Sequence, residues 1–436
     1  MIEKKQLPKI ITSIPGPKTQ SWIKRYYDVF GSHSDISIES AEGCTFQDVD
    51  GNRFLVLANS TDIAGYSNHK ILEAAEKQLK KNISRAAGSP ILIEFTEKLL
   101  SKVPKALRTG RVNFTSSGTE TVELAISLAR AYTGRPIIIS YHDSHHGFIG
   151  TPYQVSGDPR IKSTWPAKIS DIIHIPYPKC YRCPFKLHSS DCDLLCLDYL
   201  HNTLETVVLP DQVAALLFEP ILVNGGMYVP PKKYMEGIVK LCRDNGILLI
   251  MDEVYTGIGK SGKFLTMEHW NITPEILCIG KAIGGGFPLS AVVTKREVTD
   301  ETFGGVRFTG TFSGNLVACS TGLATLNYLE EKQLDMNAME VGNYLMESLK
   351  DISEEKKRIG DIRGMGLLIG IDLVEDKDSK VADGSYATII EKKALENGLI
   401  LRRVGRYRNI LALTPPLILS KTQADEALAI FTKIID

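Results

Sequence analysis

Six short apolar runs, each ending in polar or glycine residues, alternate with helical-looking segments through the middle of the chain. They are RVNFTSSG, RPIIISYHD, VAALLFEP, GILLIMDEV, EILCIGK and PLSAVVT, between residues 111 and 294. This alternation is typical of crossover units, in which a helix joins two parallel strands. Such strands form a mostly parallel sheet with helices over both faces. The sequence therefore predicts an α/β fold for this region.

The two ends of the chain have a different pattern. CTFQDVDGNRFLVL near the start has the pattern of a strand hairpin, and short strands alternate with helices after about residue 326. We assign both ends to one smaller domain. The predicted limits are residues 1–59 and 326–436 for the small domain and residues 60–325 for the large one.

Charge and terminal composition narrow the class of function. Lysine and arginine number 51, aspartate and glutamate also number 51, and the formal net charge is +0. A neutral chain lacks the positive charge that nucleic acids and anionic membranes attract. The start, MIEKKQLPKIITSIPGP, has no apolar segment of a secretion signal, and no window approaches the roughly 18 apolar residues of a membrane span. We expect a cytoplasmic protein that acts on small molecules.

Polar and charged side chains cluster directly after the predicted strands. Ligands of parallel α/β sheets bind beyond the carboxyl ends of the strands, so these residues are the first candidates for a site. They are Ser116, Ser117, Gly118, Thr119, Glu120, Asp143, His145, His146, Glu219, Asp252, Glu253 and Lys281.

Lys281 stands before three consecutive glycines, an arrangement that suggests a nucleotide-binding loop. That loop needs a glycine six residues before the lysine and Ser or Thr after it, whereas Glu275 and Ala282 occupy these positions. A better anion site is TSSGTETVELAISLARAY, where Gly118 leads from a strand into a helix whose first N–H groups can bind phosphate. An ordinary Ser or Thr helix cap explains the same stretch equally well.

Asp252 ends the very apolar run GILLIMDEV, so its carboxylate is expected to be buried and to need a cation or strong donor. A protonated pyridine nitrogen is one such partner. Lys281 follows 29 residues later, about one crossover unit, and can reach the same sheet edge. A phosphate site, a buried carboxylate and a lysine match the three needs of pyridoxal phosphate: anchorage, ring protonation and a Schiff base.

At these residues the sequence resembles the class III pyridoxal-phosphate aminotransferases, which include 4-aminobutyrate and ornithine aminotransferases. The motifs occur in family order over about residues 40 to 420. The resemblance implies the aspartate-aminotransferase fold, fold type I: a large domain with a mostly parallel seven-stranded sheet covered by helices, and a smaller α/β domain. It also implies amino transfer between an amine or amino acid and a 2-oxo acid through a pyridoxamine phosphate intermediate. The motifs are RVNFTSSGTETVELAISLARAYTGRP, FEPILVNGGMYVPP, GILLIMDEVYTGIGKSGKF, PEILCIGKAIGGGFPLSAVV, GTFSGNLVAC and IRGMGLLIGIDL.

The resemblance assigns roles position by position. Lys281 would form the Schiff base and then carry a proton between the substrate α-carbon and the cofactor. Asp252 would keep the pyridine nitrogen protonated, and the helix start at Ser117–Thr119 would bind the phosphate. Thr311 in GTFSGN would reach the phosphate of the neighbouring subunit, which implies a homodimer with shared active sites.

Two further cofactor contacts follow from the resemblance. His145 stands where the family has an aromatic residue stacked on the ring, and imidazole can stack in the same way. Tyr255 stands where the family commonly has glutamine near the 3′ oxygen, and a phenol can donate the same hydrogen bond. His146, which follows, is interpreted as a structural histidine.

The substrate positions depart from the family pattern. Phe148 and Ala412 stand where members acting on 4-aminobutyrate, ornithine or acetylornithine have arginine, and Asn224 replaces a glutamate that pairs with the second arginine. A substrate carboxylate must then be held elsewhere, with Arg403 as one candidate, while Glu219 is expected to line the pocket. An amino-acid racemase or epimerase on the same fold stays an alternative; it needs a second acid or base opposite the lysine.

Four of the eight cysteines form a cluster within a Pro-rich insertion, residues 176–200. Their spacing, C-x2-C-x8-C-x3-C, suits one zinc ion, and it also suits nested disulfides if the flanks form a hairpin. Free thiols are the third alternative, and the sequence does not choose among them. The residues are Cys180, Cys183, Cys192 and Cys196.

Overall fold

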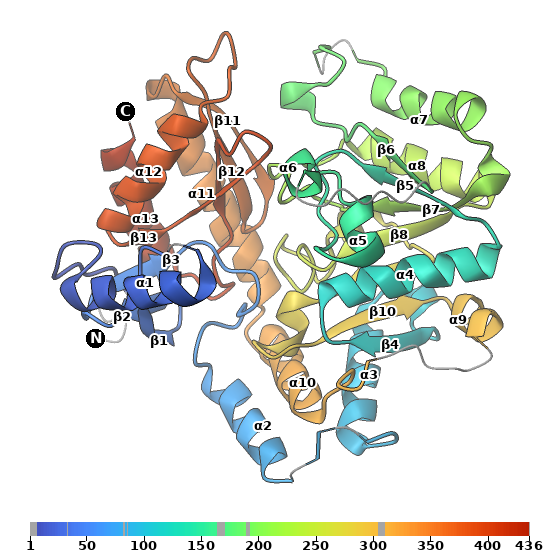
Figure 1. Ribbon diagram of the computed structural model, residues 1–436, viewed down its shortest axis with the longest axis horizontal. Coiled ribbons are helices and arrows are strands. Elements are labelled where there is room, and N and C mark those ends of the chain that lie inside the picture. Colours follow the sequence, from blue (N-terminus) through green and yellow to red (C-terminus); the bar gives the residue numbers. More distant parts are fainter. Residues whose placement is uncertain are drawn as a thin grey trace. The chain divides into compact units, whose positions relative to one another are not determined.

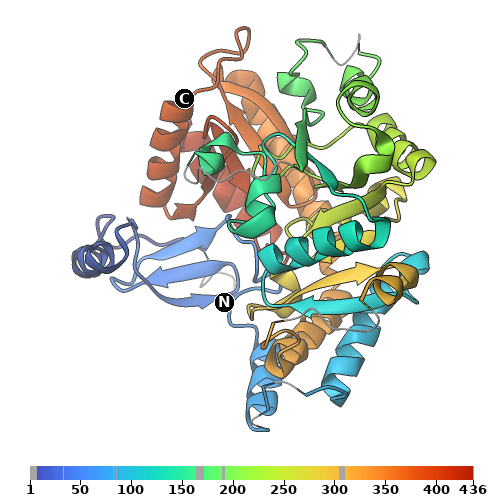
Figure 2. The same ribbon diagram turned by 45° about the vertical axis from the view of Figure 1, so that its right-hand side comes forward.

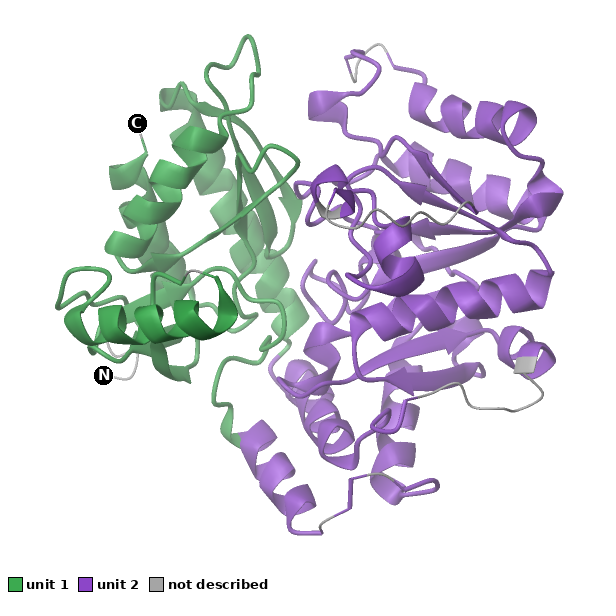
Figure 3. Ribbon diagram, in the orientation of Figure 1, with its two compact units in different colours: residues 1–69, 333–436 green, residues 70–332 purple. Residues whose placement is uncertain are grey.

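The computed structural model describes residues 7–32, 34–81, 83–84, 86–163, 171–188, 192–303 and 310–435 of the chain. The chain forms two compact units, one of residues 1–69 with 333–436 and one of residues 70–332 (Figure 3). Each unit is described by itself below. The domain limits inferred from the sequence stay a prediction.

The second unit alternates strands with helices along most of its length (Figure 1). Its strands are β4 (Arg111–Thr115), β5 (Ile137–Tyr141), β6 (Ile172–Ile175), β7 (Val213–Phe218), β8 (Leu248–Glu253), β9 (Ile276–Ile279) and β10 (Ser290–Thr294). Its helices are α2 (His69–Leu79), α3 (Pro90–Lys102), α4 (Gly118–Thr133), α5 (Gly150–Val155), α6 (Pro159–Lys162), α7 (Leu195–Thr206), α8 (Lys232–Asn245), α9 (Arg296–Phe303) and α10 (Leu316–Glu331). Short 3-10 turns are η2 (Lys105–Leu107), η3 (Cys180–Arg182), η5 (Pro210–Gln212), η6 (Thr266–Trp270) and η7 (Lys281–Gly284).

These seven strands form one sheet in the order β4-β10-β9-β8-β7-β5-β6. Strand β10 runs antiparallel to β4 and β9, and the other neighbours are parallel. The structure confirms the predicted fold class, with six of the strands at the predicted apolar runs; β6 was not predicted. Since Asp252 pairs with Cys278 of β9, the carboxylate lies one strand away from the segment that leads into Lys281.

Helix α4 packs against one face of the sheet (Figures 1 and 2). The sequence explains where this helix begins and ends. The Ser117 side chain accepts a hydrogen bond from the N–H of Glu120, and the Glu120 carboxylate accepts one from the N–H of Ser116. This reciprocal cap satisfies two N–H groups that would otherwise lack partners. The helix ends at Gly134, whose φ of 67° favours glycine. Six apolar residues of the helix pack into the core beneath: Val122, Leu124, Ala125, Ile126, Leu128 and Ala129.

The first unit contains two four-stranded sheets, ordered β1-β2-β3-β13 and β11-β12-β15-β14. The predicted hairpin is confirmed, with Phe46 opposite Phe54 in an antiparallel pair. No helix in the described part of the chain is long and apolar enough to cross a membrane. Strands are β1 (Ile38–Glu42), β2 (Thr45–Asp48), β3 (Arg53–Val56), β11 (Ile359–Met365), β12 (Leu368–Leu373), β13 (Leu399–Ile400), β14 (Arg402–Val404) and β15 (Ile410–Leu413). Helices are α1 (Pro17–Phe30), α11 (Leu334–Glu355), α12 (Gly384–Glu396) and α13 (Lys421–Ile434).

Candidate active site

A cavity of about 180 Å³ lies at the carboxyl ends of the central strands of the second unit. Its walls come from the start of α4, the segments after β5, β7 and β8, and the start of η7. The chain thus brings residues up to 163 positions apart to one place. The lining residues are Gly118, Thr119, His145, His146, Gly147, Phe148, Glu219, Asn224, Asp252, Val254, Tyr255 and Lys281.

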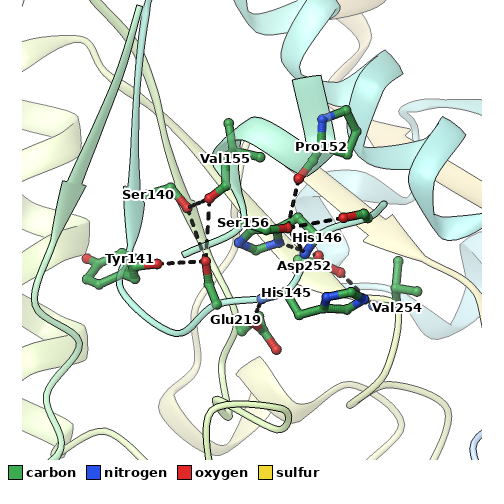
Figure 4. A network of polar contacts seen from close by, with 12 residues as sticks. Ser140, Tyr141, His145, His146, Pro152, Val155, Ser156, Glu219, Asp252 and Val254 are labelled. Atoms are coloured by element: carbon green, nitrogen blue, oxygen red, sulfur yellow. Dashed lines mark hydrogen bonds and ion pairs between the residues drawn. The ribbon is translucent and has the colours of Figure 1, made fainter. Parts of the chain in front are cut away.

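Asp252 is held by two hydrogen bonds inside the protein. One carboxylate oxygen accepts the N–H of Val254 at 3.0 Å, and the other lies 2.7 Å from Nδ1 of His146 (Figure 4). Because an ionised carboxylate only accepts, the proton of the imidazole lies on Nδ1. The His146 side chain is fully buried and its Nε2 atom has no hydrogen-bond partner, so this histidine is aimed at Asp252 and supports it. The structure adds this partner to the predicted structural role of His146.

Lys281 opens η7 with a φ of 46°, a left-handed conformation that is uncommon for a lysine. Such strained backbone occurs where the surrounding structure fixes a side chain at a functional site. Its Nζ atom lies 4.6 Å from the centroid of the Tyr255 ring. Lys281 and Tyr255 therefore meet on one wall of the cavity.

The start of α4 is the predicted anion site, and its residues Gly118 and Thr119 lie in the cavity wall. A Cβ atom on Gly118 would lie 2.7 Å from a methyl carbon of Val254, so the close approach of the helix requires glycine. Ser117 does not line the cavity, because its hydroxyl caps the helix. The helix cap is thus observed at Ser117, and the anion site at Gly118 and Thr119 stays a prediction.

Glu219 closes the cavity behind His145. Its carboxylate accepts the backbone N–H of His145 at 2.8 Å (Figure 4). Burial raises the pKa of Glu219 from 4.5 to about 7; His146 and Lys281 act in the opposite direction, while Asp252 raises it further. The His145 ring packs at 4.6 Å against Phe148, which is 62% exposed. The site therefore contains a carboxyl group that titrates near neutral pH.

Besides Ser117, the predicted residues Thr311 and Arg403 lie outside this cavity. Thr311 is exposed in a turn before α10. Arg403 belongs to the first unit, where its guanidinium group donates hydrogen bonds to Glu391 and to Thr388. Conversely, Val254 and Gly147 line the cavity and were not singled out from the sequence. Val254 directly follows the Asp-Glu pair, a position next to the predicted site that could have indicated it.

A model of the class III aminotransferases matches residues 26–435. The chain belongs to this family. The match spans nearly all of the sequence, so it covers both units and the complete cavity.

Relatives within the class III aminotransferases carry out different reactions. The chain is 34% identical to an alanine/serine racemase of Pyrococcus horikoshii, over 99% of this chain and 93% of that protein. It is 33% identical to a diaminobutyrate–2-oxoglutarate aminotransferase of Haemophilus influenzae, over 91% and 89% of the two chains. An amine transaminase from an uncultivated Pseudomonas species, solved with pyridoxal phosphate bound, superposes with a TM-score of 0.86 at 28% identity, covering 92% and 95%. The recognised family, the fold and the aminotransferase assignment are thus supported.

The cavity has the chemistry that pyridoxal phosphate needs. It contains a lysine, a buried carboxylate with a supporting histidine, and a helix start with a glycine that brings the backbone close. The family and the cofactor-bound structure support this cofactor for the class III aminotransferases.

No metal site is found at the four-cysteine cluster in the described residues. All eight cysteines are free, and no group of three or more potential metal ligands gathers in the part of the chain that the structure describes. Cys180 is exposed in η3 and Cys196 is buried on α7, and for both thiols burial and then neighbouring cysteines of the cluster raise the pKa, as expected of thiols that share neither a disulfide nor a metal. The zinc alternative is therefore not supported, and the disulfides are not formed.

Proposed function

We propose that this protein is a pyridoxal-phosphate-dependent aminotransferase in which Lys281 and Asp252 are the catalytic residues. It moves an amino group between an amine or amino acid and a 2-oxo acid. The single observation that carries the proposal is the presence of both side chains in one cavity at the start of α4. Neither a nucleotide site nor a structural cavity needs a lysine and a buried carboxylate at a helix N-terminus.

Pyridoxal phosphate supplies an aldehyde and an electron-withdrawing ring that stabilises negative charge at a substrate carbon. The Lys281 amine would hold the aldehyde and, when free, would move a proton at the substrate α-carbon. Asp252 would keep a proton on the ring nitrogen, and His146 keeps that carboxylate oriented through a hydrogen bond of 2.7 Å. The N–H groups at Gly118 and Thr119 would bind the phosphate with the positive end of the helix dipole.

The residues on either side of the ring orient the substrate. His145 would stack on the cofactor, and its backbone is fixed by Glu219. Tyr255 would donate a hydrogen bond to the 3′ oxygen from the side of Lys281, whose amine lies over its ring. Phe148 and Asn224, which also line the cavity, would contact the part of the substrate beyond the reacting carbon.

The amino donor is proposed to lack the distal carboxylate of 4-aminobutyrate. Among the residues that the structure describes, the cavity lining contains no arginine, and Lys281 is its only lysine. A carboxylate needs a charged partner or several donors when it is buried. Phe148 instead offers an exposed apolar surface. We expect donors with neutral or apolar side chains to react faster than acidic ones.

Racemisation is the second candidate, favoured by the 34% identity to an alanine/serine racemase. It requires a second group that moves a proton on the face opposite Lys281. Tyr255 lies against Lys281, which leaves His145 and Glu219 as candidates within the lining.

One experiment separates the two reactions. The holoenzyme is incubated with single L-amino acids, with and without 2-oxoglutarate, and products are analysed for both enantiomers. Transfer of the amino group that depends on the oxo acid supports the aminotransferase. Accumulation of the D-enantiomer without an acceptor contradicts it and supports the racemase.

A homodimer in the cytoplasm completes the proposal, with Thr311 contributing to the phosphate site of the partner subunit. The exposed position of Thr311 in its own subunit is consistent with such a role. Mixed dimers of Thr311→Val and Lys281→Ala chains test it. If Thr311 serves the partner, the two defects fall in one site of each mixed dimer and leave the other site intact. Cofactor affinity equal in mixed and Thr311→Val dimers argues against sharing.

A further inference from the structure

Lys260 is the only lysine or arginine that is fully buried among the described residues, with 1% of its surface exposed. It lies in the segment GIGKSGK between β8 and η6. A buried ammonium group loses its hydration, so the fold must replace that stabilisation with other interactions. None of the chemical steps proposed above uses this lysine.

The ring of Tyr255 supplies one interaction and links Lys260 to Lys281. The Nζ atom of Lys260 lies 4.8 Å from the ring centroid, and the Nζ atom of Lys281 lies 4.6 Å from the same centroid. Tyr255 is 8% exposed and lines the cavity. The electron-rich face of an aromatic ring attracts ammonium groups, most strongly where water is excluded. One ring therefore holds two lysine side chains beside the reacting position.

Two positive charges at this separation oppose each other. The distance between the two Nζ atoms cannot exceed the sum of their distances to the centroid, about 9.4 Å. At an effective dielectric constant of about 20, a charge at this distance shifts the protonation of its neighbour by roughly one pH unit. A charge on Lys260 therefore favours the uncharged amine of Lys281. That form is the one that attacks an aldehyde and accepts a proton.

We propose that Lys260 is a positioning residue of the active site: its buried charge, held on the Tyr255 ring, keeps the Lys281 amine in its uncharged, nucleophilic form. This inference rests on the proposed function, since it assumes that Lys281 reacts as an amine. Two effects of opposite sign act on Lys281: the Tyr255 ring stabilises its ammonium form, and the charge of Lys260 disfavours that form. Removal of Lys260 abolishes only the second effect.

Other titratable groups belong to the elements around Lys260 and Lys281. They come from the end of β7, the segment after β5, the end of β8, and the stretch through η6. Because Lys260→Met and Lys260→Arg change the same side chain but differ in charge, the comparison of the two variants tests the effect of that charge. The groups are Glu219, His145, His146, Asp252, Glu253, Lys263, Glu268 and His269.

The test measures how fast apoprotein recombines with added pyridoxal phosphate as a function of pH, followed by visible absorbance. Lys260→Met removes the charge and keeps an apolar side chain of similar length, while Lys260→Arg keeps the charge. We expect the pH midpoint of recombination to rise by about one unit in Lys260→Met, by the Coulomb estimate above. Lys260→Arg should keep the wild-type midpoint.

Lys260→Gln is a second neutral variant for the case that methionine prevents folding, as circular dichroism will show. A neutral variant that folds and keeps the wild-type pH midpoint overturns the proposal. This holds even if the variant is less stable, because a purely structural role of Lys260 would lower stability without moving the midpoint. An equal shift in Lys260→Arg overturns it as well. Failure of the proposed function looks different: the wild-type apoprotein would take up no pyridoxal phosphate at any pH.

Discussion

The hydrogen bond between His146 and Asp252 is predicted to be among the strongest single polar contacts in the second unit. Its atoms are 2.7 Å apart, and the two side chains are 0% and 5% exposed, so both are largely shielded from bulk water. A hydrogen bond to a charged group contributes about 1.5–3 kcal/mol, and stranding a buried carboxylate adds its own cost. His146→Phe should therefore lower the free energy of unfolding of the apoprotein by about 2–4 kcal/mol at pH 8.

A double-mutant cycle separates the pair from the general cost of changing a buried ring. His146→Phe, Asp252→Ala and the double variant are unfolded with urea as apoproteins at one protein concentration. We expect a coupling energy of about 2 kcal/mol, since the second substitution costs less once its partner is gone. His201→Phe, exposed on α7, is the matched control and should change stability by less than about 0.5 kcal/mol. A coupling energy near zero would refute the argument that His146 supports Asp252.

Three further outcomes are expected. Burial raises the pKa of Glu219 from 4.5 to about 7, so its ionisation lowers the stability of the folded state as the pH rises through that window. In urea unfolding between pH 5 and pH 8, Glu219→Gln should lose less stability than the wild type, by on the order of 2 kcal/mol. Identical pH profiles of the two proteins would contradict this. Gly118→Ala should destabilise the fold by about 1–3 kcal/mol through its contact with Val254, and Val254→Ala should restore part of the loss; no rescue in the double variant argues against the clash. Iodoacetamide should modify the exposed Cys180 before Cys278, because Cys278 is buried and burial raises the pKa of its thiol. Peptide mass mapping can show the order of modification, and the reverse order would contradict the exposure of these two cysteines in the structure.

The sheet could be read from the sequence because its strands are buried on both faces. Strands such as β7 and β8 are apolar along their whole length, and the structure buries every one of their residues. Strand β6 was missed because Ile172–Ile175 contains a histidine and follows a stretch without apolar alternation. The carboxyl ends of the strands were predictable for the same reason as the strands themselves.

The residues of the candidate site could be predicted only where a reactive side chain directly follows a strand in the sequence. Asp252 and Lys281 stand at such positions, and the family resemblance supplied their roles. The partner of Asp252 is 106 residues away in the chain, and no local pattern reports a contact at that separation. Lys260 lies among glycines, a composition typical of exposed loops, yet the structure buries it. Contacts between distant segments thus decide what a local pattern leaves open.

The central claim is that Lys281 is the lysine that binds pyridoxal phosphate covalently. Borohydride reduction of the holoenzyme fixes such a bond, and mass mapping of the peptides then locates the modified lysine. We predict modification of Lys281 alone, and no stable label in Lys281→Ala. Modification of Lys260 or another lysine in the wild-type protein, or full labelling of Lys281→Ala, would contradict the account.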